Sequence, residues 1–282
     1  MHSSIKTKPA RSRRRTVIIA AVVAVIVLGF FAHYQNNRLV VNQIDIVSDR
    51  AGSFDIVQLS DLHGKQFGEG NTRLLVEVRA LTPDLIVTTG DMIDESTTNP
   101  EEVAAFMGQL TDIAPTVAVM GNHERRSDIR ASFKQALLEE GVQVLDNQFL
   151  NLQLGESQVT LLGFDENDRI REASRSHEPL LEELAGEQDF RIVLTHYPHE
   201  YSLTDAPFNR FAFDLMFSGH AHGGQWVIPG IGGLIAPDQG FFPRYVRGLY
   251  HERLVVSPGL GNSILPLRFL NYPEIVYVRV NP

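Results

Sequence analysis

Short, almost uninterrupted runs of apolar residues alternate along the chain with segments in which apolar residues recur every three or four positions. The short runs are typical of buried strands, and the spaced segments are typical of amphipathic helices. Five of the runs predict buried strands, over residues 56–59, 85–88, 117–120, 192–194 and 215–217. This alternation predicts an α/β fold with helices on the faces of a sheet.

Four amphipathic helices are predicted between these strands. The segment Asn99-Pro100-Glu101-Glu102 has the composition of a helix start, with a capping side chain, a first-turn proline and two acids. The other helices are expected over residues 74–81, 129–140 and 179–186. A short strand is expected at 39–41, and a second sheet is expected from the strands at 150–154, 159–162, 254–256 and 275–278.

The amino-terminal region contains one long apolar segment. Residues 17–32 include no charged residue, and Thr16, His33 and Tyr34 extend them toward the ~20 residues that cross a bilayer as a helix. Six basic residues precede this segment and only Arg38 follows closely, so the amino end is expected to stay in the cytoplasm. We predict a basic cytoplasmic tail over 1–15, a transmembrane anchor over 16–34, a linker and edge strand over 35–53, and one catalytic domain over 54–282.

A cleaved signal peptide is the alternative to this anchor. Such a peptide has an apolar region of about 7–15 residues that ends in a small-x-small site, and Phe30 fits that site poorly. The triplet Ser12-Arg13-Arg14 partly resembles a twin-arginine export signal, so the export route stays open. Both routes place the domain on the extracytoplasmic side of the cell membrane, which is the localisation that we expect.

Composition narrows the chemistry that the chain can perform. None of its 282 residues is cysteine, which excludes disulfides, thiolate zinc sites, iron–sulfur clusters and a cysteine nucleophile. Any metal site must therefore use His, Asp, Glu or Asn. The formal net charge is −9 although the first 15 residues are basic, so the body of the chain is acidic and is not expected to bind nucleic acid.

Each of the five buried runs is followed at once by side chains that bind metal ions. The segments are Asp61-Leu62-His63, Gly90-Asp91, Gly121-Asn122-His123-Glu124, Thr195-His196 and Gly219-His220-Ala221-His222. Sites in open α/β sheets gather at the carboxyl ends of strands, so we expect the five ends to converge on one crevice. In the first and last segments the spacing of two residues is expected to direct both side chains the same way, as in an extended chain. The glycines permit close approach of the backbone.

Taken singly, each segment has an ordinary structural explanation as a turn, a cap or a hydrogen-bonded core histidine. Five of them in order at strand ends instead predict a site for two hard divalent ions with oxygen and imidazole ligands. The other histidines, at positions 2, 33, 177, 199 and 251, are expected to be structural or exposed. Among these, only His199 is close enough to His196 in sequence to reach the site.

In this order the segments resemble the full signature of the calcineurin-like metallophosphoesterases, over residues 56–222. Similarity to a membrane-anchored bacterial subfamily extends over Gly223-Gly224-Gln225, Gly248-Leu249-Tyr250, Ser257-Pro258-Gly259-Leu260-Gly261, Pro266-Leu267-Arg268 and Pro273-Glu274-Ile275. Some members of that subfamily are UDP-2,3-diacylglucosamine hydrolases, and others are assigned only as phosphodiesterases. The resemblance implies a four-layer sandwich of two mixed β-sheets with helices on the outer faces.

The resemblance also implies the ligands of two metal ions, for which manganese, zinc and iron are the candidates. One ion is held by Asp61, His63, Asp91 and His222. The second is held by Asp91, Asn122, His196 and His220, so that Asp91 bridges the two. In such proteins His123 lies beside the metals and assists the phosphoryl oxygen or the leaving group.

These residues predict a metal-dependent phosphoric ester hydrolase. Two divalent ions about 3.5–4 Å apart activate a bridging water and clamp the phosphoryl oxygens, so a metal-bridging hydroxide is the expected nucleophile. His123 is then available as the general acid. We expect a phosphodiesterase or pyrophosphate-bond hydrolase that acts on an envelope or lipid-linked substrate. A phosphomonoesterase of broad specificity and a non-catalytic, metal-bearing binding protein are the alternatives.

Residues 225–250 are rich in glycine, proline and aromatic side chains, and they allow two interpretations. They form either a surface loop packed by its own aromatics or a substrate lip, with apolar groups facing lipid and arginines meeting phosphate. The residues concerned are Phe241, Phe242, Arg244, Tyr245 and Arg247.

Overall fold

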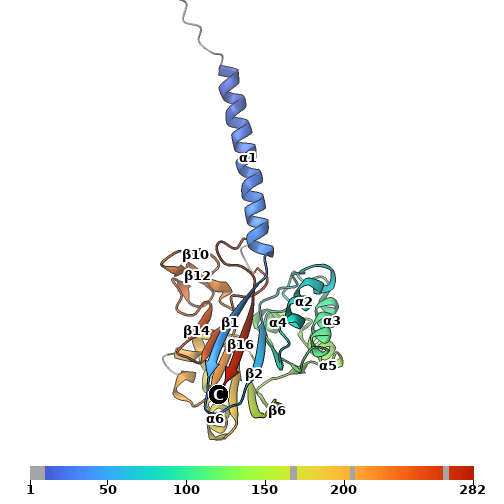
Figure 1. Cartoon of the computed structure of the whole chain (residues 1–282), viewed down its shortest axis with the longest axis vertical. Helices are drawn as coiled ribbons and strands as arrows, with labels where there is room; N and C mark the ends of the chain where they lie inside the picture. Colours follow the sequence, from blue (N-terminus) through green and yellow to red (C-terminus); the bar gives the residue numbers. More distant parts are fainter. Residues whose placement is uncertain (1–9, 166–169, 204–206, 263–266) are drawn as a thin grey trace, which may run out of the picture.

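The computed structural model describes residues 10–165, 170–203, 207–262 and 267–282. His2, Pro266 and two of the six basic residues of the amino-terminal tail, Lys6 and Lys8, lie outside these ranges. A long helix, α1 (Ala10–Asn37), projects from an α/β domain built on two six-stranded sheets (Figure 1). By length and composition alone, residues 14–37 of this helix can cross a membrane, with a mean hydropathy of 2.6 in their most apolar window.

The first sheet has the strand order β1-β16-β2-β3-β4-β5. These strands are β1 (Val40–Val47), β16 (Glu274–Asn281), β2 (Phe54–Leu59), β3 (Leu85–Thr89), β4 (Thr116–Val119) and β5 (Gln143–Val144). Strand β16 is parallel to β1 and antiparallel to β2, whereas β2 to β5 are parallel to one another. The sheet is therefore mixed, with β1 at one edge.

The second sheet has the order β14-β15-β9-β8-β7-β6 and is also mixed. Its strands are β14 (Gly248–Tyr250), β15 (Leu254–Val256), β9 (Leu215–Ser218), β8 (Phe190–Leu194), β7 (Ser157–Gly163) and β6 (Gln148–Leu154). Two small hairpins lie between β9 and β14 in the chain. They are β10–β11 (Val227–Ile228 and Gly232–Gly233) and β12–β13 (Ile235–Ala236 and Gly240–Phe241).

Helices cover the outer face of each sheet, which gives four layers. On the first sheet the apolar sides of α2 (Thr72–Ala80), α3 (Pro100–Thr111) and α5 (Arg130–Glu139) share one core with the strands. On the second sheet, α6 (Ile170–Gly186) packs its apolar side against the strands. The expected sandwich of two mixed sheets flanked by helices is confirmed.

A second core lies between the two sheets. Buried side chains of both sheets meet there, and the rings of Phe54 on β2 and Phe190 on β8 pack edge to face at 5.4 Å. Near the strand ends a polar bridge replaces the apolar contacts, because the amide of Gln58 donates to the carbonyl of Ser218 on the other sheet at 2.8 Å. This buried hydrogen bond fixes the spacing of the sheets directly below the candidate site.

Three details differ from the sequence expectations. The strand expected at 275–278 lies in the first sheet as part of β16, because an apolar run marks a buried strand without specifying its partner. Helix α6 begins at Ile170, so Pro179 lies inside it rather than at its start. Asn99 makes no side-chain cap at the start of α3; its amide donates to Glu102 instead.

Strand register places the carboxyl ends of β2, β3 and β4 at the base of α1. Strand β1 starts three residues after α1 ends, and its first residue, Val40, pairs with Glu274. Two residues further along β16, Val276 pairs with Gln58, close to the end of β2. The residues that follow β2 are therefore level with the junction between α1 and the domain.

Candidate metal centre

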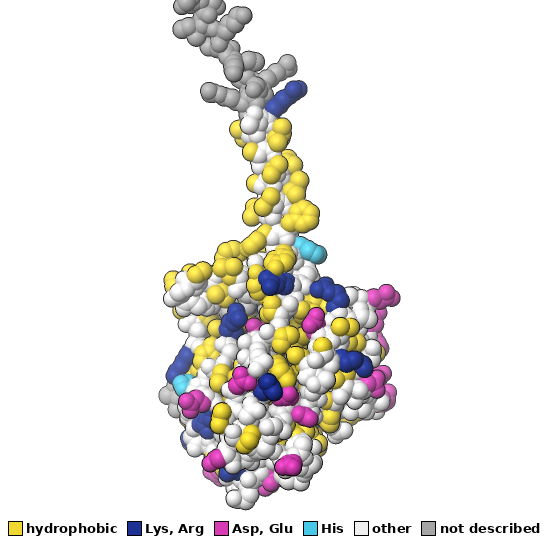
Figure 2. Space-filling model, viewed as in Figure 1, with side chains coloured by type: hydrophobic (Ala, Val, Ile, Leu, Met, Phe, Trp, Pro, Cys, Tyr) yellow, Lys and Arg dark blue, Asp and Glu magenta, His cyan; other side chains and the backbone are white. Residues whose placement is uncertain are grey.

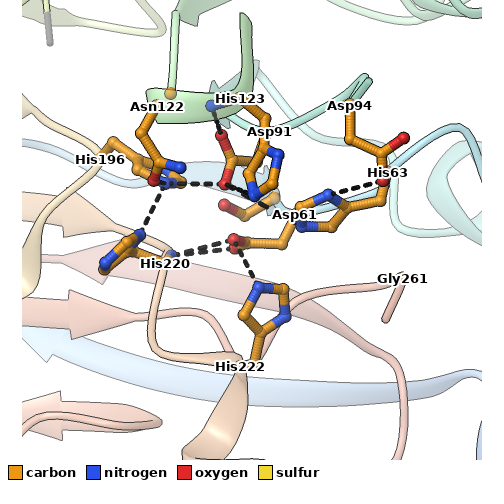
Figure 3. A network of polar contacts seen from close by, with 12 residues as sticks. Asp61, His63, Asp91, Asp94, Asn122, His123, His196, His220, His222 and Gly261 are labelled. Atoms are coloured by element: carbon orange, nitrogen blue, oxygen red, sulfur yellow. Dashed lines mark hydrogen bonds and ion pairs between the residues drawn. The ribbon is translucent and has the colours of Figure 1, made fainter. Parts of the chain in front are cut away.

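The five polar strand ends meet in one place, but they come from both sheets rather than from one. Strands β2, β3 and β4 of the first sheet and β8 and β9 of the second lead into it. Figure 3 shows the side chains directed toward one another across the gap between the sheets. They are Asp61, His63, Asp91, Asn122, His123, His196, His220 and His222, the complete set expected from the sequence.

At five of these residues the backbone is left-handed rather than extended. Positive φ angles occur at Asp61 (52°), His63 (51°), Asp91 (54°), His220 (66°) and His222 (46°). The expectation that an extended chain directs the paired side chains is therefore wrong: a tight turn beyond each strand does so. Non-glycine residues in this conformation cost of order 1–3 kcal/mol each and concentrate at functional sites, where the surrounding structure holds them in place.

One group of donors surrounds His196. Its Nε2 lies 3.1 Å from Oδ2 of Asp91, 3.2 Å from Oδ1 of Asn122 and 3.1 Å from Nδ1 of His220. The opposite nitrogen of His196 lies 2.7 Å from the carbonyl oxygen of Thr89. A carbonyl only accepts, so Nδ1 of His196 carries the proton and Nε2 faces the group as an acceptor in the neutral ring.

His220 also directs an acceptor nitrogen toward this group. Its Nε2 lies 2.8 Å from the carboxylate of Asp238, so that nitrogen donates and Nδ1 is the acceptor. Two ring acceptors, a carboxylate oxygen and an amide oxygen thus face a common point. Such a donor set repels itself unless a cation lies between its members, and its nitrogen and oxygen atoms suit a divalent transition metal. These residues therefore fit a metal ion.

The second group of donors consists of Asp61, His63 and His222. Their ligand atoms lie within 4.8 Å of one another, and Nε2 of His222 is 3.6 Å from Oδ1 of Asp61. Nε2 of His63 is one of the buried side-chain nitrogens of the described residues that lack a hydrogen-bond partner. Buried polar atoms are rarely left unsatisfied, so this nitrogen also points to a bound cation.

Asp91 lies between the two groups. Its Oδ2 is 3.1 Å from His196 on one side and 3.9 Å from His63 on the other. Burial opposes ionisation of this carboxyl group, but attraction to His196, His63 and His123 in their protonated forms outweighs burial and holds the pKa of Asp91 below its usual range. The carboxylate is thus charged and positioned to contact ions in both groups.

Burial also sets the charge of the histidines. It lowers the pKa of His220 and moves that of His222 well below the usual value, so both rings are neutral near pH 7. In His63, burial acts in the same direction, but the carboxylate of Asp94, 3.3 Å from Nδ1, together with those of Asp91 and Asp61 outweighs burial and raises the pKa. Neutral imidazoles are the form that binds metal.

Close backbone packing sets the position of the central carboxylate. A Cβ on Gly121 would lie 2.2 Å from Oδ1 of Asp91, and one on Gly90 would lie 2.5 Å from the nitrogen of Gly121. Any larger residue would displace the turns that follow β3 and β4. The two glycines thus allow Asp91 to sit directly against the start of α4 (Asn122–Arg126), where its Oδ1 accepts the backbone N–H of His123 at 2.9 Å.

Residues 54–224 match the profile of the family described as calcineurin-like phosphoesterase. The chain belongs to this family. It is 32% identical over 231 residues to the uncharacterized metallophosphoesterase YkuE of Bacillus subtilis, with 79% of this chain and 77% of YkuE covered. It is also 29% identical over 287 residues to phosphodiesterase YaeI of Escherichia coli, with 95% and 99% covered.

A third relative, a transmembrane protein with a metallophosphoesterase domain from Danio rerio, is 27% identical over 281 residues, with 95% of this chain and 63% of that protein covered. Membership of the metallophosphoesterases makes the chain a hydrolase of phosphoric esters that uses divalent metal ions. The His and Asp clusters at these strand ends are groups that can hold such ions.

Several residues that orient the donors were not expected from the sequence. Glu124 is buried behind Asp91, and its carboxylate accepts the backbone N–H groups of Asp91, Gly121 and Ile93 at 2.8–2.9 Å. Glu124 belongs to the Gly-Asn-His-Glu segment that the sequence singled out, but the sequence did not indicate that this carboxylate holds the backbone around Asp91. Asp94 and Asp238 carry no comparable signal, since they reach His63 and His220 only in the folded chain.

Arg268 holds the segment that packs against the turn carrying Asp61. Its buried guanidinium donates to the carbonyls of Pro258 and Gly261, and the N–H of Gly261 donates to the carbonyl of Asp61 at 2.6 Å. Burial lowers the pKa of Arg268 to about 10, which leaves the group charged at pH 7. The turn that carries Asp61 is therefore held by a fixed cation.

Two further histidines, His199 and His177, lie outside the donor groups. The ring of His199 is 6.3 Å from that of His220, outside both donor groups, and burial lowers its pKa to about 4. His177 stacks on Phe164 in the core of the second sheet.

In residues 225–250 neither the self-packed surface loop nor the substrate lip describes the whole stretch. Tyr245 is a core residue, whereas Phe241 and Phe242 are exposed.

Proposed function

We propose that the chain is a dinuclear metal-dependent phosphodiesterase, or pyrophosphate-bond hydrolase, that acts on a lipid-linked or envelope substrate at the outer surface of the cell membrane. The observation that carries this proposal is the position of the donor groups. The donors that follow β2 lie level with the base of α1, and the other donors meet them there, so the site lies on the side of the domain where the chain would meet a membrane.

Two ions would be held by the two donor groups with Asp91 between them. The first ion takes Asp61, His63, Asp91 and His222, and the second takes Asp91, Asn122, His196 and His220. When bound, such ions, manganese, zinc or iron, supply a nucleophilic water at neutral pH and offset the negative charge of the phosphoryl oxygens. The chain's part is to keep His220 and His222 neutral, to keep Asp91 ionised and to hold every donor rigid.

His123 is the residue that we assign to the leaving group. Its Nε2 is 4.0 Å from Oδ2 of Asp91, and its Nδ1 lies 2.8 Å from the carboxylate of Glu95. The hydrogen bond with His123 lowers the pKa of Glu95, which keeps that carboxylate ionised and the ring oriented. With one nitrogen held by Glu95, the other is positioned to deliver a proton to the departing oxygen.

The membrane arrangement that we propose uses the division of the chain that the sequence predicts. Residues 1–15 form a basic cytoplasmic tail, 16–34 the transmembrane anchor, 35–53 the linker and edge strand, and 54–282 the catalytic domain outside the cytoplasm. The excess of basic residues before the apolar segment supports this orientation. A substrate with an apolar tail is then presented to the crevice in the plane of the bilayer.

The deciding experiment assays the detergent-solubilised full chain with a chromogenic phosphodiester, the matching monoester and a pyrophosphate-linked sugar nucleotide, each with and without manganese. We expect metal-dependent cleavage of the diester or the pyrophosphate bond in preference to the monoester. Preference for the monoester would replace the proposal with a phosphomonoesterase. Bound metal without any turnover would favour a binding protein.

A further inference from the structure

An exposed apolar surface lies beside the base of α1. The β10–β11 and β12–β13 hairpins occupy this position (Figure 1), and Figure 2 shows hydrophobic side chains gathered over them. We call this surface the hairpin patch. Its residues are exposed by 36% to 70% and comprise Trp226, Ile231, Phe241, Phe242, Phe269 and Leu270. Apolar surface of this kind on a folded domain marks a site of contact with a partner or a membrane.

The hairpin patch is continuous with the apolar part of α1. The ring of Phe269 lies 5.8 Å from the ring of Phe31, which belongs to the apolar segment 17–32. Phe269 in turn forms a β-bridge with Trp226 at the start of the first hairpin. A helix that spans a bilayer up to Phe31 therefore carries Phe269 and Trp226 to the depth at which it leaves the lipid.

The junction holds the domain at a fixed angle to the helix. Gln35 is only 2% exposed; its side chain accepts the backbone N–H of Leu270 at 3.0 Å and donates to the hydroxyl of Tyr272 at 3.3 Å. The ring of Tyr34 packs on Tyr272 edge to face, with centroids 6.0 Å apart. With these contacts on the last turn of α1, the hairpin patch keeps its place beside the helix rather than rotating away from it.

We propose that the hairpin patch docks into the headgroup region of the same bilayer that α1 spans. The inference rests on the anchoring role of α1 in the proposed function. Aromatic side chains favour the membrane interface, and buried apolar surface stabilises such contacts by about 25 cal/mol per Å². A second copy of the chain is the weaker occupant, because a bilayer that surrounds α1 up to Phe31 already lies against Phe269.

Docking would connect the lipid surface directly to the metal centre. The β12–β13 hairpin ends in the exposed residues Phe241 and Phe242, and its turn carries Asp238, which orients His220. A hairpin seated in the headgroup region holds this side of the crevice at the level of lipid phosphates. The substrate class that fits is a phosphodiester or pyrophosphate whose apolar tail remains in the bilayer during cleavage.

The chain contains its own probe for this contact, since Trp226 is its only tryptophan. The full-length protein is reconstituted into phosphatidylcholine vesicles, with and without lipids brominated near the headgroup end of the acyl chains. We expect bromolipid to quench Trp226 emission and aqueous iodide to have little effect. Quenching by iodide alone overturns the inference, and so does shielding from both quenchers, which would indicate a second copy or another protein on the patch.

Flotation of the vesicles separates this inference from the proposed function. If the full chain fails to float with lipid, the anchor itself is refuted; if it floats and Trp226 ignores bromolipid, only the docking is refuted. The double variant Phe241→Ser, Phe242→Ser is expected to float while losing part of the bromolipid quenching. Its matched control is Val47→Ser, an apolar residue 81% exposed at the far end of β1, for which the quenching should not change.

Discussion

Asp238, in the turn between β12 and β13, lies 2.8 Å from Nε2 of His220 and fixes which nitrogen of that ring faces the metal centre. The acceptor nitrogen of His220 then points at His196, 3.1 Å away. Carboxylate partners of metal-binding histidines act in this way on ring orientation and basicity. Residues 18 positions apart in the chain thus form one unit in the fold.

Asp238→Ala is expected to weaken metal binding without unfolding the domain. The ring of His220 loses its orienting partner, and loss of such a contact usually lowers metal affinity by about 10–100-fold. Titration of the metal-free protein with manganese measures the change. Asp49→Ala, at an exposed position outside the crevice, is the control. Equal affinities in the two variants would remove Asp238 from the centre.

Asp91→Ala is expected to be the most damaging single change. It deletes the carboxylate that lies between both donor groups, so two ions would face each other without the negative charge that separates them. Metal content of the folded variant should fall together with activity, while Asp45→Ala, exposed on β1, keeps both. Two equivalents of metal in folded Asp91→Ala would refute the bridging assignment.

His123→Gln is expected to keep its metals and fold while losing roughly 10²–10⁴-fold in rate, the usual contribution of a general acid. The loss should shrink as the leaving group becomes more acidic, because a good leaving group needs no proton. A series of aryl phosphodiesters measures this dependence. A uniform loss across the series, or loss of metal, would contradict the assignment to the leaving group.

The sequence identifies the side chains that the fold brings together, because their signal is local. Each metal-capable side chain follows its own apolar run within a few residues, as Asp91 follows β3 and His196 follows β8. Contacts between distant segments have no such signal. The place of β16 between β1 and β2, the pairing of Asp238 with His220, and the origin of the crevice in two sheets all depend on tertiary packing.

The left-handed turns illustrate the same limit. A spacing of two residues in Asp61 and His63 correctly indicates a shared direction, but the cause is a strained turn rather than an extended chain. That strain is held by packing from elsewhere, including Gly259, where a Cβ would lie 2.7 Å from that of Asp61. The intrinsic backbone preferences of Asp and His disfavour a left-handed conformation. Sequence reasoning therefore fails where the site adopts a backbone that those preferences disfavour.

Acid should release metal through His63 first. The carboxylates of Asp94, Asp91 and Asp61 together outweigh burial and raise the pKa of His63, whereas burial lowers that of His220, so protons compete with metal at His63 as the pH falls. Asp94→Asn removes part of this raising effect, and the acidic limb of manganese binding should move to lower pH. Bound metal measured across a pH series tests this. An unchanged limb would indicate that another group controls it.

A catalytic domain outside the cytoplasm requires that a reporter fused after Pro282 report export: alkaline phosphatase should be active there, and green fluorescent protein exported by the general route should be dark. The opposite result would place the crevice in the cytoplasm. Removal of the anchor needs care, because Gln35 is buried against Leu270 and Tyr272. A chain that starts at His33 keeps these contacts, and it should cleave a chromogenic diester normally but a bilayer-embedded substrate more slowly, since the anchor raises the local concentration of that substrate.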